Sequence, residues 1–172
     1  MKILVIYATR QGTSRKCAEI LTDALCSKAF DIDTFDIESN PPSPDGYDVA
    51  VIGGSIRMGS LNKKLKKYLK AHSKKLNSIN TAIFLCCGIS TDVDDYITLQ
   101  IPKSLNPSLD IHYFGGELKP EKAKGFDKIA LKAMRSSVKD VDFESPDKND
   151  TPLPEIIPEN IMRLADKIRS LL

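Results

Sequence analysis

Residues 2–14 read KILVIYATRQGTS, and this stretch decides the fold class. Its first part, Lys2 to Ala8, is apolar and rich in β-branched residues, which predicts a strand buried inside a parallel sheet. A short loop follows, and a helical pattern begins where the loop ends. A strand that passes through a short loop into a helix is the repeating unit of alternating α/β proteins.

The loop from Thr9 to Ser14 has the composition of a phosphate-binding site. It leads to a helix N-terminus, where unpaired N–H groups and the helix dipole favour an anion. The hydroxyls of Thr9, Thr13 and Ser14 add possible donors. The alternative is that Thr13 or Ser14 only caps the helix, which such residues often do. The loop alone leaves both interpretations open.

Two commoner phosphate-binding loops are absent from the sequence. The lack of G-x-x-x-x-G-K-[ST] argues against a nucleoside triphosphatase. The lack of G-x-G-x-x-G argues against a dinucleotide whose pyrophosphate lies over glycine backbone. A hydroxyl-rich loop with one glycine suits a single terminal phosphate instead.

The composition excludes several other classes of protein. The 172 residues are enough for one domain, and 25 basic against 23 acidic residues are too balanced for a nucleic-acid-binding protein. No apolar run is long enough for a transmembrane segment, and the N-terminus has no pattern of a signal peptide. The four cysteines have no C-x-x-C spacing, which argues against zinc, and unpaired cysteines predict a cytoplasmic location.

Strand and helix patterns alternate along the chain. Strands are predicted over residues 2–8, 32–35, 47–54, 81–87 and 110–114. Helices are predicted from the phosphate loop to near Phe30, and over 61–76, 92–100 and 158–171. This order predicts an α/β fold, a doubly wound five-stranded parallel sheet with helices on both faces. We expect one domain over residues 1–172, with an insertion at 117–154 before the last helix.

Three loops are expected to meet at the carboxyl edge of the sheet, where such folds bind ligands. The phosphate loop is the first, and GGSIRMGS at 53–60 and CCGIS at 86–90 follow the third and fourth predicted strands. Gly53 and Gly54 would permit close approach of a flat ligand, and Met58 offers a soft apolar surface. One phosphate loop and two loops for a planar ring indicate a mononucleotide site.

The segments ATRQGTS at 8–14, YDVAVIGGSIRMG at 47–59 and FLCCG at 84–88 together resemble the flavodoxin family. The resemblance is most specific for the menaquinone-dependent, flavodoxin-like protoporphyrinogen dehydrogenases. That branch is similar in T-R-x-G, in Y-D-x-x-V-I-G-x-S-I-R-x-G and in a helix that bears lysine and histidine and ends like KLNS at 75–78. It also carries an insertion before the last helix.

The resemblance implies a flavodoxin-like fold and an FMN cofactor. By the same resemblance, the Met58–Gly59 peptide turns its carbonyl toward flavin N5. The residues implied for the phosphate are Thr9, Arg10, Gln11, Gly12, Thr13 and Ser14. The residues implied for the ring are Ser55, Ile56, Arg57, Met58, Gly59, Cys86, Cys87 and Gly88.

Two functions share this cofactor site. The first is a diffusible FMN electron carrier with a redox partner protein, and the alternative is a quinone-linked protoporphyrinogen IX dehydrogenase in peripheral contact with a membrane. The chain has no tryptophan, and its insertion has fewer aromatic residues than that of the enzymes, which favours the carrier. A phosphoacceptor receiver is excluded, because Gly53 and Gly54 stand where it needs an aspartate.

Three features can be interpreted either as functional or as ordinary structural and surface features. Arg57 either steadies a negative ring or substrate, or pairs with a local acid. Buried inert thiols are favoured over redox chemistry for Cys86 and Cys87. The lysines between Leu61 and Leu76, a segment without an acid, form either a solvated face or a docking face for an acidic partner or anionic lipid.

Overall fold

The computed structural model describes residues 1–57, 59–87, 100–117 and 155–172. The predictions made for Met58, for Gly88, for the helix over 92–100 apart from Gln100, and for 118–154 of the insertion lie outside the described residues.

The core of the protein is a five-stranded parallel sheet with the order β2-β1-β3-β4-β5. Its strands are β1 (Lys2–Ala8), β2 (Asp31–Asp36), β3 (Val49–Ser55), β4 (Asn80–Cys86) and β5 (Ile111–Tyr113). One row of paired residues crosses the whole sheet, and its members are all apolar: Phe35, Ile6, Ile52, Ile83 and Ile111. The predicted sheet is confirmed.

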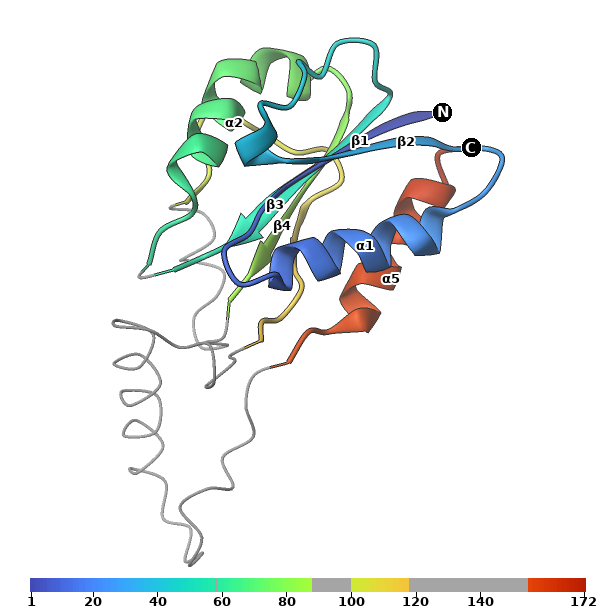
Figure 1. Cartoon of the computed structure of the whole chain (residues 1–172). Coiled ribbons are helices and arrows are strands. Elements are labelled where there is room, and N and C mark those ends of the chain that lie inside the picture. The colour runs from blue at the N-terminus through green and yellow to red at the C-terminus, as the bar shows by residue number, and fades with distance from the viewer. Residues whose placement is uncertain (58, 88–99, 118–154) are drawn as a thin grey trace, which may run out of the picture.

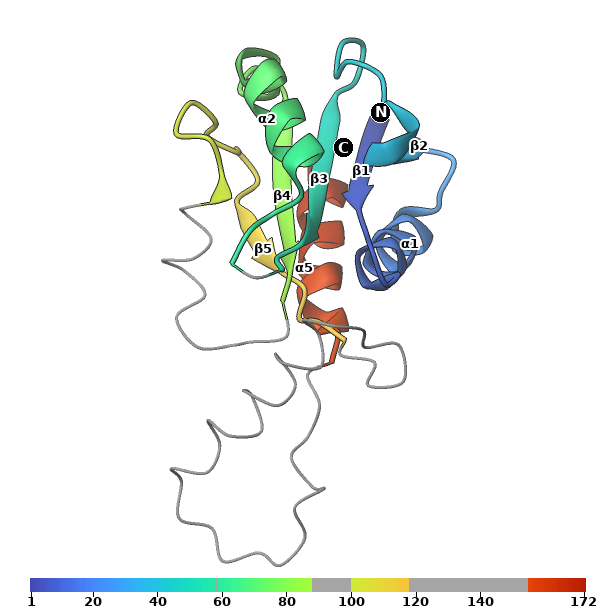
Figure 2. The same cartoon turned by 60° about the vertical axis from the view of Figure 1, so that its left-hand side comes forward.

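Helices cover both faces of this sheet (Figures 1 and 2). On one face, α1 (Thr13–Leu25) and α5 (Pro158–Arg169) pack over a core that contains Leu21, Phe84 and Leu164. On the other face, α2 (Lys63–Leu76) and the short η1 (Ile37–Ser39) enclose a second core around Ile52 and Leu65. The doubly wound architecture is therefore confirmed.

The end of α1 differs from the prediction. The helix was expected to continue to near Phe30, but it ends at Leu25. Cys26 has a ψ of 105°, outside the helical region, and its N–H bonds to Asp23 O at 3.2 Å. The following residues form a turn in which the Phe30 N–H bonds to Ser27 O, and this turn leads the chain into β2.

Gly53 and Gly54 also have a different role from the one expected. They lie within β3, and the space beside them is taken by neighbouring strands. A Cβ on Gly53 would lie 2.0 Å from the carbonyl oxygen of Phe84, and one on Gly54 would lie 2.9 Å from that of Ala8. These glycines therefore allow close packing inside the sheet and leave no gap for a flat ligand.

This packing predicts that Gly53→Ala lowers the free energy of unfolding by about 3 kcal/mol, the cost of forcing an atom into a filled core. Gly46→Ala is the matched control, since Gly46 has a φ of +82° but no atom within 4 Å of the added Cβ. That change should cost about 1 kcal/mol, the strain of a left-handed backbone. Urea unfolding measures both values, and equal losses would contradict the packing role.

Candidate functional site

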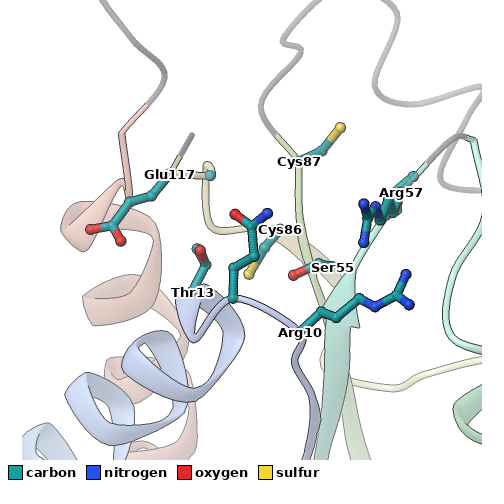
Figure 3. Close-up of a pocket in the computed structure, with 10 residues that line it drawn as sticks. Arg10, Thr13, Ser55, Arg57, Cys86, Cys87 and Glu117 are labelled. Atoms are coloured by element: carbon teal, nitrogen blue, oxygen red, sulfur yellow. The ribbon is translucent and has the colours of Figure 1, made fainter. Parts of the chain in front are cut away.

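A cavity of about 110 Å³ lies at the carboxyl edge of the sheet. It sits beside the point where the strand order reverses, since β1 is followed by β2 on one side and β3 on the other. Four segments line it, from the β1–α1 loop, the β3–α2 loop, the end of β4 and the end of β5. The lining residues are Arg10, Gln11, Thr13, Ser55, Ile56, Arg57, Cys86, Cys87, Gly116 and Glu117 (Figure 3).

The N-terminus of α1 opens onto this cavity without a side-chain cap. Gly12 is the N-cap, with a φ of +98°, and a glycine has no side chain with which to cap the first turn. Thr13 is already the first helical residue. The interpretation that Thr13 or Ser14 caps the helix is therefore wrong. The N–H groups of the first turn keep the arrangement that favours an anion.

The three hydroxyls predicted for this loop have different places. Thr13 lines the cavity and is 6% exposed. Thr9 accepts a hydrogen bond from the Gly12 N–H at 3.0 Å, which shapes the loop. Ser14 is fully buried, and its Oγ lies 2.7 Å from Ser55 Oγ. This pair ties the first turn of α1 to the end of β3, so that the two predicted loops keep a fixed spacing.

The β3–α2 loop is held by backbone and side-chain hydrogen bonds. The Ile56 N–H bonds to Cys86 O at 2.8 Å, and Arg57 and Ser60 exchange two backbone hydrogen bonds at 3.0 and 2.9 Å. Gly59 turns the chain with a φ of +69°. Its carbonyl accepts a hydrogen bond from Gln100 Nε2 at 2.7 Å.

Gln100 is a residue that sequence reasoning missed. Its side chain is 7% exposed, and while its Nε2 donates to Gly59 O, its Oε1 accepts from the Leu61 N–H at 3.1 Å. One amide thus holds the loop from both sides of Ser60. A single polar residue between Leu99 and Ile101 was the only signal for it in the sequence.

The two thiols at the end of β4 differ, although both were expected to be buried: the Cys86 thiol is buried and structural, whereas Cys87 is half-buried and lines the cavity. Cys86 is 2% exposed, and its Sγ lies 3.7 Å from that of Cys17 on α1. A hydrogen bond with Cys17 and burial raise the pKa of the Cys86 thiol well above its ordinary value. Cys86 is therefore protonated at neutral pH, and a protonated buried thiol is unreactive. The Cys87 carbonyl accepts a hydrogen bond from Tyr113 Oη at 2.6 Å.

Sequence reasoning also missed the fourth wall of the cavity, formed by Gly116 and Glu117. Gly115, with a φ of +75°, turns the chain after β5, and a Cβ there would lie 2.2 Å from Glu155 O. Glu117 Oε1 lies 2.6 Å from Lys16 Nζ on α1, which raises the pKa of Lys16. In the sequence, the pair Gly115–Gly116 after the fifth predicted strand was the signal that could have indicated this wall of the cavity.

Charge is distributed unevenly around the cavity. Arg10 and Arg57 lie on one side of it, and Glu117 lies on the opposite side (Figure 3). Two guanidinium groups and a helix N-terminus suit a negatively charged ligand, and Ile56 adds an apolar contact.

The described part of the chain contains no cluster of three or more histidine, cysteine or acidic side chains able to hold a metal ion. None of its helices combines the length and the apolar character needed to cross a membrane.

Comparisons of the sequence and of the structure with known proteins agree on one family. The family model described as a flavodoxin domain matches residues 4–144. Protoporphyrinogen IX dehydrogenase [quinone] of Escherichia coli K12 is 32% identical over 85 residues, which are 49% of this chain and 47% of that protein. The chain thus matches the curated relatives over about half of their length.

Solved structures support the fold. The two-electron reduced flavodoxin of Megasphaera elsdenii matches with a TM-score of 0.55 and 15% identity, over 76% of this chain and 97% of that chain. The oxidised flavodoxin 1 of Bacillus cereus matches with a TM-score of 0.51 and 15% identity, over 83% and 100%. At this level of identity the likeness concerns the architecture alone.

Proposed function

The chain belongs to the flavodoxin domain family, and on this premise we propose that it binds FMN and transfers electrons through the bound flavin. The observation that carries the proposal is the uncapped N-terminus of α1, which opens into a cavity at the switch point of the sheet. A terminal phosphate fits that position because first-turn N–H groups and the helix dipole stabilise an anion.

We assign the phosphate to residues 9–14 and the ring to the loops at 55–59 and 86–88. FMN supplies the redox chemistry when bound. Thr13 would donate its hydroxyl to the phosphate, and Gly12 gives the loop its turn without a side chain in the way. The Ser14–Ser55 pair keeps the phosphate loop at a fixed distance from the ring loop. Burial and hydrogen bonds from the protein then tune the potential of the flavin.

The partner in electron transfer is either a redox protein or a quinone. The relation to the E. coli quinone-linked enzyme favours the second possibility as an alternative function, oxidation of protoporphyrinogen IX. The carrier is the preferred function, because it needs only the cofactor site and a docking face. We propose the cytoplasm as the location, which the unpaired thiols of Cys17, Cys26, Cys86 and Cys87 support.

FMN should bind the purified protein and raise its melting temperature, because a ligand that binds only the native state stabilises it. FAD should have a much smaller effect, since the loop at 9–14 suits a terminal phosphate. Differential scanning fluorimetry with FMN, FAD and riboflavin measures this directly. An unchanged melting temperature at roughly millimolar FMN would overturn the proposed function.

Thr13→Ala should weaken FMN binding about tenfold and leave riboflavin binding nearly unchanged, because the lost hydrogen bond goes to a charged group. Thr22→Ala is the matched control on the same helix, where the exposed Thr22 hydroxyl bonds only to Glu19 O at 2.9 Å. Flavin fluorescence quenching measures the affinity of the wild type and of both variants for FMN and for riboflavin. Equal losses for FMN and riboflavin would show that Thr13 does not contact the phosphate.

The carrier should not oxidise protoporphyrinogen IX in steady state. The test mixes FMN-loaded protein, protoporphyrinogen IX and the soluble quinone menadione without oxygen, and follows porphyrin fluorescence against a sample without protein. A rate equal to that of the sample without protein is expected. Faster formation of protoporphyrin, repeated over many turnovers, would favour the quinone-linked enzyme instead.

A further inference from the structure

Apart from Lys66, the lysines of α2 fall into two groups that differ in their ion pairs. Lys64 pairs with Glu38 of η1, and Lys75 Nζ lies 3.9 Å from Asp45. Both lysines lie on the flank of the helix that faces the segment between β2 and β3. Lys64 holds the pKa of Glu38 below its ordinary value. The charge on this flank is therefore locally compensated.

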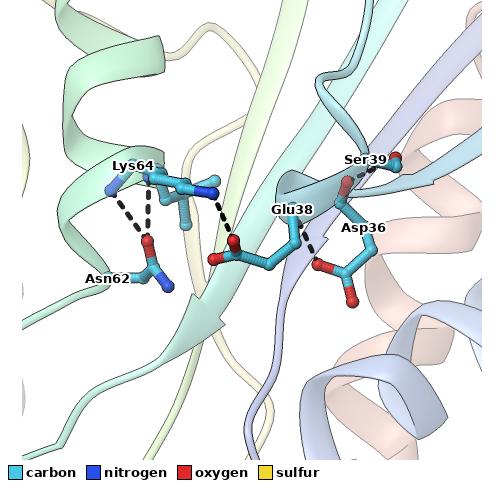
Figure 4. Close-up of polar contacts among 6 residues, drawn as sticks. Asp36, Glu38, Ser39, Asn62 and Lys64 are labelled. Atoms are coloured by element: carbon cyan, nitrogen blue, oxygen red, sulfur yellow. Dashed lines mark hydrogen bonds and ion pairs between the residues drawn. The ribbon is translucent and has the colours of Figure 1, made fainter.

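Hydrogen bonds to the backbone on both sides fix the Lys64–Glu38 pair in place (Figure 4). Asn62 caps α2 by accepting the Lys64 and Leu65 N–H groups at 2.8 and 3.3 Å. Asp36 accepts the Glu38 N–H at 3.0 Å. The start of α2 thus binds one carboxylate of this chain, that of Glu38, with a defined geometry.

The second group has no such compensation, and we call it the lysine stripe. At about 100° per residue, its members lie on one line along the helix, opposite the buried Leu65, Leu69 and Leu76. All its members are exposed, and within the described residues none of them has an ion-pair partner. The lysine stripe consists of Lys63, Lys67, Lys70 and Lys74.

The stripe begins at the end of the loop that contributes to the cavity. Lys63 follows the loop that contains the cavity residues Ile56 and Arg57. Lys66, beside the stripe, donates from Nζ to Ser60 Oγ at 3.1 Å and so ties the first turns of α2 to that loop. From there the stripe runs about 16 Å along the helix.

The far end of the stripe is extended by a further lysine. Asn77, just after α2, donates from Nδ2 to Ser104 O and accepts from the Asn106 N–H, both at 2.8 Å. These bonds place the exposed Lys103 close to the C-terminal end of α2. The basic surface therefore continues beyond the helix.

We propose that the lysine stripe docks an acidic electron-transfer protein next to the flavin site. The proposal rests on the proposed function, because a carrier must meet a partner at the edge that holds its cofactor. A protein is favoured over a membrane because the stripe offers charge alone. The exposed large apolar residues of the described chain are Met162, Leu171 and Leu172, on or after α5, which covers the other face of the sheet.

The expected effect is on the rate of association more than on affinity. Each exposed ion pair adds little to binding, but a field of like charges raises association rates by about 10- to 1,000-fold at low salt. Redox proteins that meet transiently also bury small, charged interfaces. Salt should therefore slow the encounter, because exposed charges are screened over about 10 Å at 0.1 M ionic strength.

The experiment uses FMN-loaded protein and, as the probe, a reduced plant-type [2Fe–2S] ferredoxin, which is acidic. The iron–sulfur cluster gives up one electron and the flavin accepts it, and stopped-flow absorbance follows the rate. The test variant is Lys67→Glu/Lys70→Glu. The matched control is Lys28→Glu/Arg163→Glu, which changes the net charge equally at exposed positions away from α2. Circular dichroism checks that both variants are folded.

At low salt, the test variant should react about tenfold more slowly than the wild type, and the control close to the wild-type rate. Raising the ionic strength should slow the wild type and bring the test variant and the wild type together. Equal rates for the two variants would overturn the docking surface. Binding to phosphatidylglycerol vesicles that the test variant loses, with an unchanged ferredoxin rate, would also overturn it in favour of a membrane.

FMN loading is measured first by absorbance, so that failure of the proposed FMN binding can be distinguished from failure of the proposed docking surface. A protein that takes up no FMN overturns the proposed function and the docking surface with it. A loaded protein whose rates do not depend on the charge of α2 overturns only the docking surface.

Discussion

The pairing of β1 with β2 on one side and β3 on the other is the constraint on which the site depends. Because the chain reverses its direction of sheet growth at β1, the loops after β1 and β3 separate toward opposite faces, and a crevice opens between them. The row of apolar residues through Ile6 and Ile52 keeps this arrangement in register, since a shift by one residue would move each buried side chain into the core on the opposite face of the sheet. The cavity is thus a consequence of topology before any polar residue is considered.

Beneath the cavity, small side chains connect elements that come from distant parts of the chain. The hydroxyls of Ser14 and Ser55 join α1 to β3, and the thiols of Cys17 and Cys86 join α1 to β4. Small residues are needed here because the first turn of α1 packs against two strand ends at once. The polar atoms satisfy one another instead of solvent, which a buried hydroxyl requires. The geometry of the cofactor loops is therefore set by packing below them.

Local patterns in the sequence predicted the strands and helices well, because apolar runs and helical spacing depend on near neighbours. The predicted end of α1 was wrong. The composition of residues 26–30 permits a helix, but the backbone of Cys26 leaves the helical region. Gln100 and Glu117 were missed for another reason. Each acts across a long sequence distance, on Gly59 and on Lys16 respectively, and no local pattern encodes such a contact. The role of Gly53 likewise became clear only from the position of Phe84.

The net charge of +2 conceals a strong local asymmetry. On α2, lysines on one flank meet carboxylates of this chain, while the lysines facing solvent meet none among the described residues. Electrostatic steering depends on how charge is distributed over a surface and only weakly on its sum. A nearly neutral protein that carries a row of uncompensated lysines on one helix has a direction from which acidic molecules approach. Because α2 begins where the loop beside the cavity ends, that direction leads to the candidate flavin site.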